Sequence, residues 1–296
     1  MGRGHPECPA RLDAICDHLR ATGLDIALAM RDAPEATDEQ LARAHESRYV
    51  AELKDALAEV EASGRPHAFD PDTAACPATR VAALRAAGAA IAATDAVISG
   101  EAENAFCAVR PPGHHATRDQ AMGFCFFNNV AVAARHALDV HGLERVAIVD
   151  FDVHHGNGTE DIVAGDERIL MASFFQHPLY PGSGAVPMGT NMVNVPIPPY
   201  TKGGEVREII EAMWMPRLEE FRPQMVFISA GFDAHREDEL GQLGLVEADY
   251  EWITRRIKQV ADRHAQGRIV SCLEGGYALS ALARSVAAHL RVLAGV

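Results

Sequence analysis

The stretch V-A-I-V-D-F-D-V-H-H-G-N-G, from Val146 to Gly158, decides how the rest of the chain is interpreted. A short apolar run changes abruptly into aspartates and histidines, as in a buried parallel strand that carries ligands at its carboxyl end. If the chain stays extended through His154, the side chains of residues 150, 152 and 154 share one face, because side chains alternate along a strand. The stretch therefore predicts a metal site with carboxylate and imidazole donors, although the acids could instead cap the following turn.

Length allows one large α/β domain or two small ones and does not by itself decide between them. The 296 residues are 48% hydrophobic, and they contain no repeat, linker or low-complexity tract, so we expect one domain spanning residues 1–296. There is no run of about 18 apolar residues and no signal-like start, so we expect no membrane span. The six cysteines are scattered without a C-x-x-C pair, which fits a reducing cytoplasm.

The chain is acidic, with 41 acidic against 27 basic residues and a net charge of -14. This balance disfavours nucleic acids and anionic membranes as partners. It weakly favours a cationic substrate, although acidity is also a general means of staying soluble.

Short apolar runs alternate with amphipathic segments from residue 105 onward. We expect strands at 105–109, 146–151, 168–174, 192–196, 225–230 and 268–273, and helices at 8–22, 48–62, 77–98, 128–141, 204–220, 246–265 and 278–293. Such alternation predicts a parallel sheet with helices on both faces. A loop at 64–77 contains Asp70 and Asp72, which we interpret as turn residues rather than as part of a site rim.

Four of the expected strands end in glycine together with reactive side chains. The segments are R-P-P-G-H-H at 110–115, D-F-D-V-H at 150–154, S-A-G-F-D-A-H at 229–235 and E-G-G-Y at 274–277. In an open α/β sheet, ligands bind beyond the carboxyl ends of the strands, so these four loops should converge.

The converging residues offer metal ligands and a proton carrier. Asp152, His154 and Asp233 form a mixed N/O set of three, which leaves the open position that a catalytic zinc requires; ferrous iron or cobalt would also suit these donors. His114 and His115 are a candidate acid/base pair, because imidazole titrates near neutrality.

Other residues near these strand ends have a functional and a structural interpretation. Asp150 could orient one histidine ring and Asn157 the other, or the two could be a buried acid and a turn residue. Tyr277, after a flexible glycine pair, could donate to a developing oxyanion, or it could serve packing. Phe124, after Gly123, and Tyr180 could be the walls of a narrow apolar tunnel, or ordinary core.

Taken together, these motifs resemble the histone deacetylase superfamily. The motifs are H-P-E at 5–7 with Arg11, R-P-P-G-H-H at 110–115, G-F-C-F-F-N-N at 123–129, D-F-D-V-H-H-G-N-G at 150–158, S-A-G-F-D-A at 229–234 and E-G-G-Y at 274–277. They follow the family's order over nearly the whole chain. Asn157 and the G-F-D-A loop resemble the class II branch, which includes bacterial deacetylase-like amidohydrolases and acetylpolyamine amidohydrolases.

The resemblance implies an arginase-like, three-layer α/β fold with a central eight-stranded parallel sheet. It implies one zinc ion on Asp152, His154 and Asp233, with His115 as general base and acid. His114 would be an electrostatic helper and Tyr277 the donor to the tetrahedral intermediate.

The resemblance also assigns residues around this centre. Those implied for the acyl-lysine tunnel and the substrate are Gly123, Phe124, Tyr180, Gly275, Gly276 and Leu240, with Arg11 beside the cavity through which acetate leaves. A potassium ion near the zinc is implied on Asp150, Asp152, His154, Ser173 and the Phe174 carbonyl. His155 is left with a structural role, its side chain directed to the opposite face.

The chain departs from the family pattern at two places. Relatives usually carry a short strand before the H-P-E motif, and only four residues precede it here, so Met1 is an internal methionine or the sheet edge is trimmed. Polyamine-selective relatives place an acid seven residues after the third metal ligand, where this chain has Leu240. That weakens the polyamine interpretation, although residues 237–239 (Glu-Asp-Glu) keep the rim acidic.

The leading hypothesis is zinc-dependent hydrolysis of acetyl groups from N-acetylated primary amines such as acetyl-lysine, in the cytoplasm, by a chain that could form a homo-oligomer. Small acetylated amines such as polyamines are the first alternative. A dimetal ureohydrolase of the same fold is less favoured, because residues 233–237 (D-A-H-R-E) supply no second aspartate in register. A non-catalytic acyl-amine-binding protein is the third alternative.

Overall fold

The computed structural model describes residue 2 and residues 4–296. The helices are α1 (Ala10–Thr22), α2 (Asp38–Leu41), α3 (Ser47–Ser63), α4 (Thr79–Ile98), α5 (Asn129–Asp139), α6 (Asn157–Val163), α7 (Gly203–Ile209), α8 (Met215–Phe221), α9 (Glu247–His264) and α10 (Leu279–Ala294). A 3₁₀ turn η1 (Leu24–Ala27) follows α1, and a π-helical turn η2 (Ile210–Trp214) joins α7 to α8. The helices expected from periodicity are therefore present, whereas the short α2 and α6 were not predicted.

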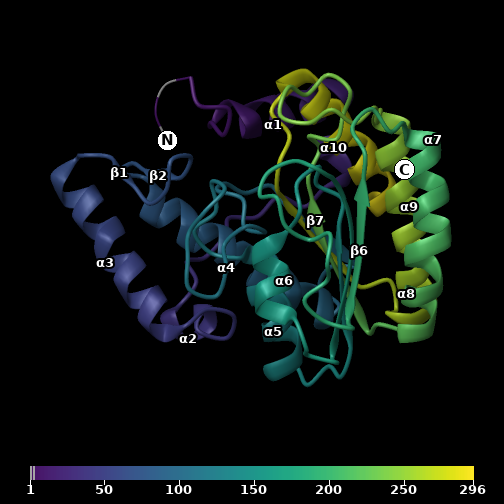
Figure 1. The fold of residues 1–296 in the computed structure, drawn as a ribbon, viewed down its shortest axis with the longest axis horizontal. Helices are drawn as coiled ribbons and strands as arrows, with labels where there is room; N and C mark the ends of the chain where they lie inside the picture. Colours follow the sequence, from purple (N-terminus) through teal and green to yellow (C-terminus); the bar gives the residue numbers. More distant parts are fainter. Residues whose placement is uncertain (1, 3) are drawn as a thin grey trace.

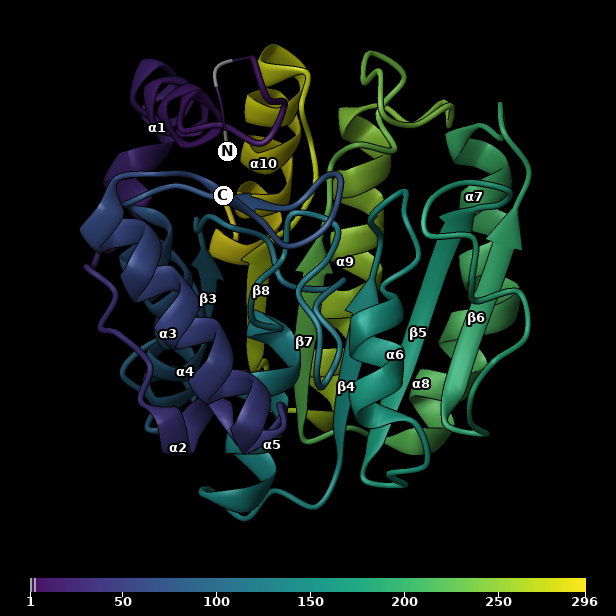
Figure 2. The same cartoon turned by 60° about the vertical axis from the view of Figure 1, so that its left-hand side comes forward.

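The central sheet contains β3 (Asn104–Cys107), β4 (Val146–Asp150), β5 (Ile169–Gln176), β6 (Met192–Ile197), β7 (Met225–Ala230) and β8 (Ile269–Leu273). All neighbours are parallel and the order is β3-β8-β7-β4-β5-β6, and Figure 2 shows the strands side by side. From β4 the chain adds strands outward on one side and then returns to the other side through β7 and β8. The winding thus reverses between β4 and β7, where α/β sheets bind their ligands.

The expected count of eight strands is wrong for the described residues, which place six in this sheet. The separate hairpin of β1 (His67–Ala68) and β2 (Ala74–Ala75) pairs only with itself. The parallel arrangement with helices around it is confirmed, because the six apolar runs identified in the sequence are the six strands.

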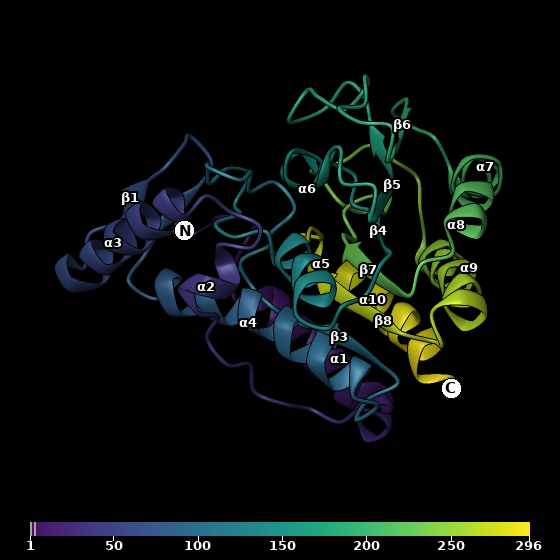
Figure 3. The same ribbon diagram turned by 90° about the horizontal axis from the view of Figure 1, so that it is seen from below.

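Helices cover both faces of the sheet and make it the middle of three layers (Figure 3). One face packs against α4, α5 and α6, with α3 and the β1–β2 hairpin outside α4 (Figure 1). The other face packs against α1, α9, α10 and the α7–α8 segment. Strand β4 shows the period of two directly, since Ala147 and Val149 face one apolar core while Val146 and Ile148 face the other.

Helix α4 is long and apolar enough to cross a membrane by length and composition alone, with a mean hydropathy of 1.6 over its best window. It packs against α5, β3 and β8, and 56% of that window is buried inside the protein. We therefore interpret α4 as a core helix whose alanine-rich surface permits close packing.

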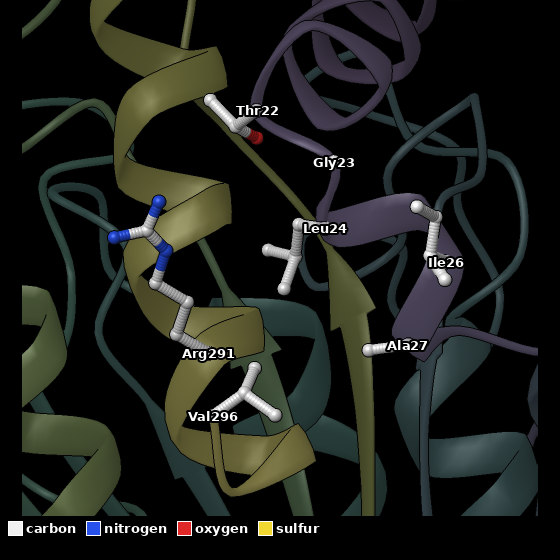
Figure 4. A pocket seen from close by; sticks show the side chains of 7 residues that line it. All are labelled: Thr22, Gly23, Leu24, Ile26, Ala27, Arg291 and Val296. Carbon is white, nitrogen blue, oxygen red and sulfur yellow. The ribbon is translucent and has the colours of Figure 1, made fainter.

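A shallow hollow on the surface lies between the end of α1, η1 and the end of α10 (Figure 4). Its lining residues are Thr22, Gly23, Leu24, Ile26, Ala27, Arg291 and Val296. Of these lining residues Arg291 is the one with a charged side chain, and none is a histidine, a cysteine or an acid.

Candidate active site

The loops that follow β3, β4, β7 and β8 meet beyond the carboxyl ends of these strands, as the comparison of strand ends predicts. The Gly275 N–H donates to Asp152 Oδ2 at 2.8 Å, which joins the β8 loop to the β4 loop. The Val153 N–H donates to Asp233 Oδ1 at 2.9 Å, which joins the β4 loop to the β7 loop. The Nε2 atom of His114, from the β3 loop, lies 3.8 Å from Asp152 Oδ2.

Asp152, His154 and Asp233 form one cluster, with one donor atom from each within 4.8 Å of the others. His154 Nδ1 lies 3.0 Å from Asp152 Oδ1 and 3.1 Å from Asp233 Oδ2. Strand β4 ends at Asp150, so the expectation of an extended chain through His154 is wrong. A bend in the chain after β4, and not the alternation of side chains along an extended strand, brings these donors together.

The electrostatics of this cluster fit a bound cation. Both carboxylates are completely buried. Burial, followed by the charge of Asp152, raises the pKa of Asp233 to about 7. Burial alone would lower the pKa of His154, but its contacts with Asp152 and Asp233 raise it to about 10. Two adjacent buried carboxylates with a single imidazole are a donor set that a divalent metal ion would satisfy.

Glycine is required beside the cluster because the backbone of two loops touches the carboxylates. A Cβ atom on Gly231 would lie 2.0 Å from Asp152 Oδ2, and one on Gly275 would lie 2.0 Å from Asp233 Oδ2. The glycines of the β7 and β8 loops therefore allow these loops to pack directly against the two acids, and the Gly275 N–H donates to Asp152.

His114 and His115 have different partners and different pKa values. His114 Nδ1 lies 3.0 Å from Asp150 Oδ2, and the charges of Asp152 and Asp150 outweigh burial and raise the pKa of His114 well above its usual value. His115 Nδ1 lies 2.8 Å from Asn157 Oδ1. Burial and the neighbouring histidines hold the pKa of His115 well below its usual value.

The amide of Asn157 defines the tautomer of His115. Its Nδ2 donates to Met122 Sδ at 3.3 Å, so its carbonyl oxygen faces His115. A carbonyl oxygen can only accept, so His115 Nδ1 carries the hydrogen and Nε2 keeps a lone pair. Asn157 is the first residue of α6, so its alternative interpretation as a turn residue is wrong. One ring of the pair is thus suited to accept a proton, and the other to carry positive charge.

The loop that carries Tyr277 is held by buried charges on both sides. Asp238 Oδ2 accepts from the N–H groups of Tyr277 at 2.6 Å and Ala278 at 3.0 Å. Arg11 Nε donates to the Gly276 carbonyl at 2.7 Å, and its guanidinium carbon lies 4.9 Å from the centre of the Tyr277 ring. Burial raises the pKa of Tyr277 well above its usual value, so the side chain stays a phenol that can donate a hydrogen bond.

The aromatic residues expected to form a tunnel lie beside the histidines and the tyrosine. The Tyr180 ring is 5.2 Å from His115 and 6.3 Å from His154, and it is 38% exposed. The Phe124 ring is 6.0 Å from Tyr277. Phe124 has a φ of +69°, which is strained for a non-glycine residue, and its N–H donates to Thr73 Oγ1 at 3.0 Å.

The β1–β2 hairpin supports this aromatic edge. Asp70 Oδ1 accepts from the Asp72 N–H at 2.8 Å and also from the Thr73 N–H, and so makes the turn that presents Thr73 to Phe124. The interpretation of Asp70 as a turn residue therefore agrees with the structure. Gly123 packs so closely on His115 that a Cβ there would lie 2.4 Å from the ring.

Residues 5–293 match the histone deacetylase domain family. The chain belongs to the histone deacetylase family. It is 40% identical over 281 residues to the histone deacetylase-like amidohydrolase of Pseudomonas aeruginosa, covering 93% of this chain and 73% of that protein. It is 39% identical over 283 residues to a probable deacetylase of Archaeoglobus fulgidus, covering 93% and 77%.

The chain is also similar to a protein named as a polyamine deacetylase and to a solved structure. The polyamine deacetylase HDAC10 of Mus musculus is 37% identical over 308 residues, covering 98% of this chain and 45% of that protein. The crystal structure of the HDA15 HD domain superposes with a TM-score of 0.91 at 35% identity, covering 100% of this chain and 83% of that one. This deacetylase family member is therefore a hydrolase of amide bonds with the family's fold.

Two acids near this centre have roles that the sequence did not reveal. Glu274, completely buried, accepts from the N–H groups of Gly113 at 2.6 Å and His114 at 3.1 Å, and burial raises its pKa to about 7. Asp238 was expected to keep the rim acidic, and this is wrong, because its side chain is buried and accepts from backbone N–H groups. An acid directly after an apolar strand was the only signal for Glu274.

The remaining predicted residues lie around this centre. Ser173 of β5 is paired in register with Asp150 of β4, and the Phe174 side chain stacks on Trp214 in the core, so only its carbonyl could serve a cation. His155 is buried with Nε2 2.7 Å from Glu160 Oε2 of α6, as its structural interpretation requires.

Leu240 lies next to Asp238 in the β7 loop and is partly exposed. Its N–H donates to Asp238 Oδ1 at 3.0 Å. Leu240 is thus a partly exposed apolar side chain on a loop whose backbone is held by the buried Asp238.

Proposed function

We propose that this chain is a zinc-dependent amidohydrolase that removes acetyl groups from N-acetylated primary amines such as acetyl-lysine and releases acetate. The observation that carries the proposal is one buried constellation. A three-donor N/O cluster lies beside two histidines whose Nδ1 atoms face different partners, an aspartate and an asparagine.

Zinc fits the donors that the chain supplies. Asp152, His154 and Asp233 offer two carboxylates and one imidazole and leave a coordination position open, as in catalytic zinc sites. Zinc bound there would polarise the acetyl carbonyl and acidify a water molecule.

The chain's own residues would carry the proton transfers. His115, fixed by Asn157 with a free Nε2 lone pair, accepts a proton from the attacking water and returns it to the leaving amine. His114, paired with Asp150, supplies positive charge beside the reacting carbonyl. The Tyr277 phenol donates to the oxygen that becomes negative, a contribution of roughly a hundredfold or more in rate.

The substrate would enter between aromatic side chains. Phe124 and Tyr180 lie next to Tyr277 and His115, and their apolar rings suit the methylene chain of a lysine or a simple amine. Gly123, Gly275 and Gly276 would form part of its wall through their backbone, and Arg11 would lie at its inner end. Leu240 favours acetyl-lysine over acetylated polyamines, which would gain from an acid at that position.

The same proposal includes further properties of the enzyme. A potassium ion would be held near the zinc by Asp150, Ser173 and the Phe174 carbonyl. Residues 1–296 would form one catalytic domain acting in the cytoplasm, which the six free cysteines support.

Turnover assays on purified protein test this function. We expect hydrolysis of acetyl-lysine peptides that stops with a chelator and returns with zinc, and slower hydrolysis of acetylated polyamines. Tyr277→Phe should lower turnover about a hundredfold, whereas Tyr200→Phe, at an exposed position, should not. Absence of chelator-sensitive acetate release from every acetylated amine would refute the proposal, and release of urea from a guanidino substrate would support a ureohydrolase instead.

A further inference from the structure

A second cluster of metal-binding side chains lies far from the catalytic loops, where α4 and α5 end. Asp95 is in the last turn of α4, His136 is in the last turn of α5, and His141 follows α5. Strand β4 begins at Val146, five residues after His141, so the cluster lies at the amino ends of the strands. Figure 2 shows the end of α5 on the side away from the arrowheads.

The three side chains converge on one point. His136 Nε2 lies 2.7 Å from Asp95 Oδ1, and His141 Nε2 lies 2.6 Å from the same oxygen. One donor atom from each residue lies within 4.8 Å of the others, as in the catalytic cluster. Both clusters therefore combine carboxylate and imidazole donors, here with two imidazoles and one carboxylate.

The surroundings favour a cation at this point. The carboxyl ends of α4 and α5 both contribute partial negative charge, because the carbonyls of a last turn lack helical partners. His136 is almost completely buried, and its Nδ1 has no hydrogen-bond partner within the described part of the chain. Burial therefore fixes the position of the His136 ring, whose Nε2 points at the Asp95 carboxylate.

The cluster can expand to the size of a metal site. Tetrahedral ligands about 2.0 Å from zinc are separated by about 3.3 Å, somewhat more than the present contacts. The Asp95 side chain is 51% exposed and the His141 side chain 25% exposed, so both can move outward while His136, at 6%, stays fixed. The exposed side leaves room for water to complete the coordination.

We propose that Asp95, His136 and His141 bind a second divalent transition-metal ion, Zn²⁺, which joins the ends of α4 and α5 and takes no part in catalysis. Two imidazoles and a carboxylate are donors that suit zinc, and a site with only three protein ligands would bind more weakly than one closed by four. The site is independent of the proposed deacetylation, because the catalytic loops lie at the other end of the sheet.

Zinc stoichiometry separates the two sites. Full-length protein would be equilibrated with Zn²⁺, freed of excess by gel filtration and analysed by elemental mass spectrometry. We expect two zinc ions per chain in the wild type, one in His141→Ala and one in Asp233→Asn, which disables only the catalytic cluster. The double variant that combines His141→Ala with Asp233→Asn should bind no zinc.

A matched control and a second readout keep the test decisive. His264 Nε2 lies 2.7 Å from Glu219 in a surface pair with a single histidine, so His264→Ala should keep both zinc ions. Added Zn²⁺ should raise the melting temperature of Asp233→Asn but not that of the double variant. One zinc in the wild type, or an unchanged zinc count in His141→Ala, would overturn the proposal. His141→Ala should retain wild-type turnover whether or not deacetylation is confirmed.

Discussion

Asp238 is predicted to position Tyr277, and Asp238→Asn tests this with little change in volume. The side chain is 6% exposed, and its oxygens accept from the N–H groups of Tyr277, Ala278 and Leu240 at 2.6, 3.0 and 3.0 Å. An asparagine has only one accepting oxygen. If that oxygen keeps the hydrogen bonds from the Tyr277 and Ala278 N–H groups, the new NH₂ group faces the Leu240 N–H. Two donors then face each other without an acceptor.

The expected magnitudes follow from these three hydrogen bonds. One unsatisfied buried N–H costs about 1–3 kcal/mol of unfolding free energy. The other two hydrogen bonds become weaker because they then end on a neutral amide oxygen and not on a carboxylate. A total near 3 kcal/mol corresponds to a fall of roughly 6 °C in melting temperature. Misplacement of a catalytic group by about 1 Å can cost up to a hundredfold in rate. Because two of the three bonds persist, we expect kcat to fall about tenfold with little change in KM.

A double-mutant cycle with Tyr277→Phe distinguishes positioning from general destabilisation. If Asp238 acts through the phenol, Asp238→Asn should lower kcat about tenfold in the wild type and hardly at all in Tyr277→Phe, a coupling of about 1.4 kcal/mol. Glu239→Gln, an exposed neighbour in the same loop, is the matched control and should leave kcat unchanged. An equal tenfold loss in both backgrounds, or a lower melting temperature with unchanged kcat, would refute the reasoning.

Three further predictions concern the proposed base, the metal cluster and a buried histidine. Asn157→Asp places a negative charge beside His115, whose pKa is held low by burial, and this charge should raise that pKa and move the acidic limb of the kcat/KM profile to higher pH. An unmoved limb would argue against His115 as the base. Gly231→Ala puts a Cβ 2.0 Å from Asp152 Oδ2, and competition titration should show at least about tenfold weaker zinc binding; wild-type affinity would contradict this. Burial lowers the pKa of His45 to about 4, so the unfolded chain binds a proton first as the pH falls below about 6.5, and about 2 kcal/mol of unfolding free energy should be lost between pH 7 and 5. Denaturant titrations should find that loss absent in His45→Gln, and a loss of the same size there would assign it to other groups.

The order of elements was predictable from the sequence because burial on both faces gives strands a continuous apolar signature. All five residues of β4 are buried, and so are all eight of β5. The number of strands was not predictable in this way. It was taken from the family resemblance, and the chain has no further apolar run that hydrogen-bonds to β3 or β6 in the described residues. Helix α6 was missed because its seven residues are too short to show a periodicity.

The candidate site was predictable where a residue type implies its own chemistry. Histidines and aspartates after apolar runs pointed to Asp152 and Asp233, and the switch point of the sheet brought them together. Glu274 and Asp238 were not identified in this way, because their partners are backbone N–H groups. Which N–H groups lack a partner depends on the folded path of each loop, and no local sequence pattern records that path.

The acids around the centre therefore have two different tasks. Among the described residues, Asp150, Asp152, Asp233, Asp238 and Glu274 are all at most 6% exposed and crowd into one region. Asp238 and Glu274 accept from protein N–H groups, and Asp150 faces His114, so their charge is offset within the chain. Asp152 and Asp233 also accept from loop N–H groups, but they lie together against one imidazole, His154, and the nearby His114 is already paired with Asp150. Two adjacent buried charges are therefore not fully offset. The negative charge that the protein does not compensate lies where the metal donors converge. A cation bound there would offset this charge at the position where the proposed chemistry requires a metal ion.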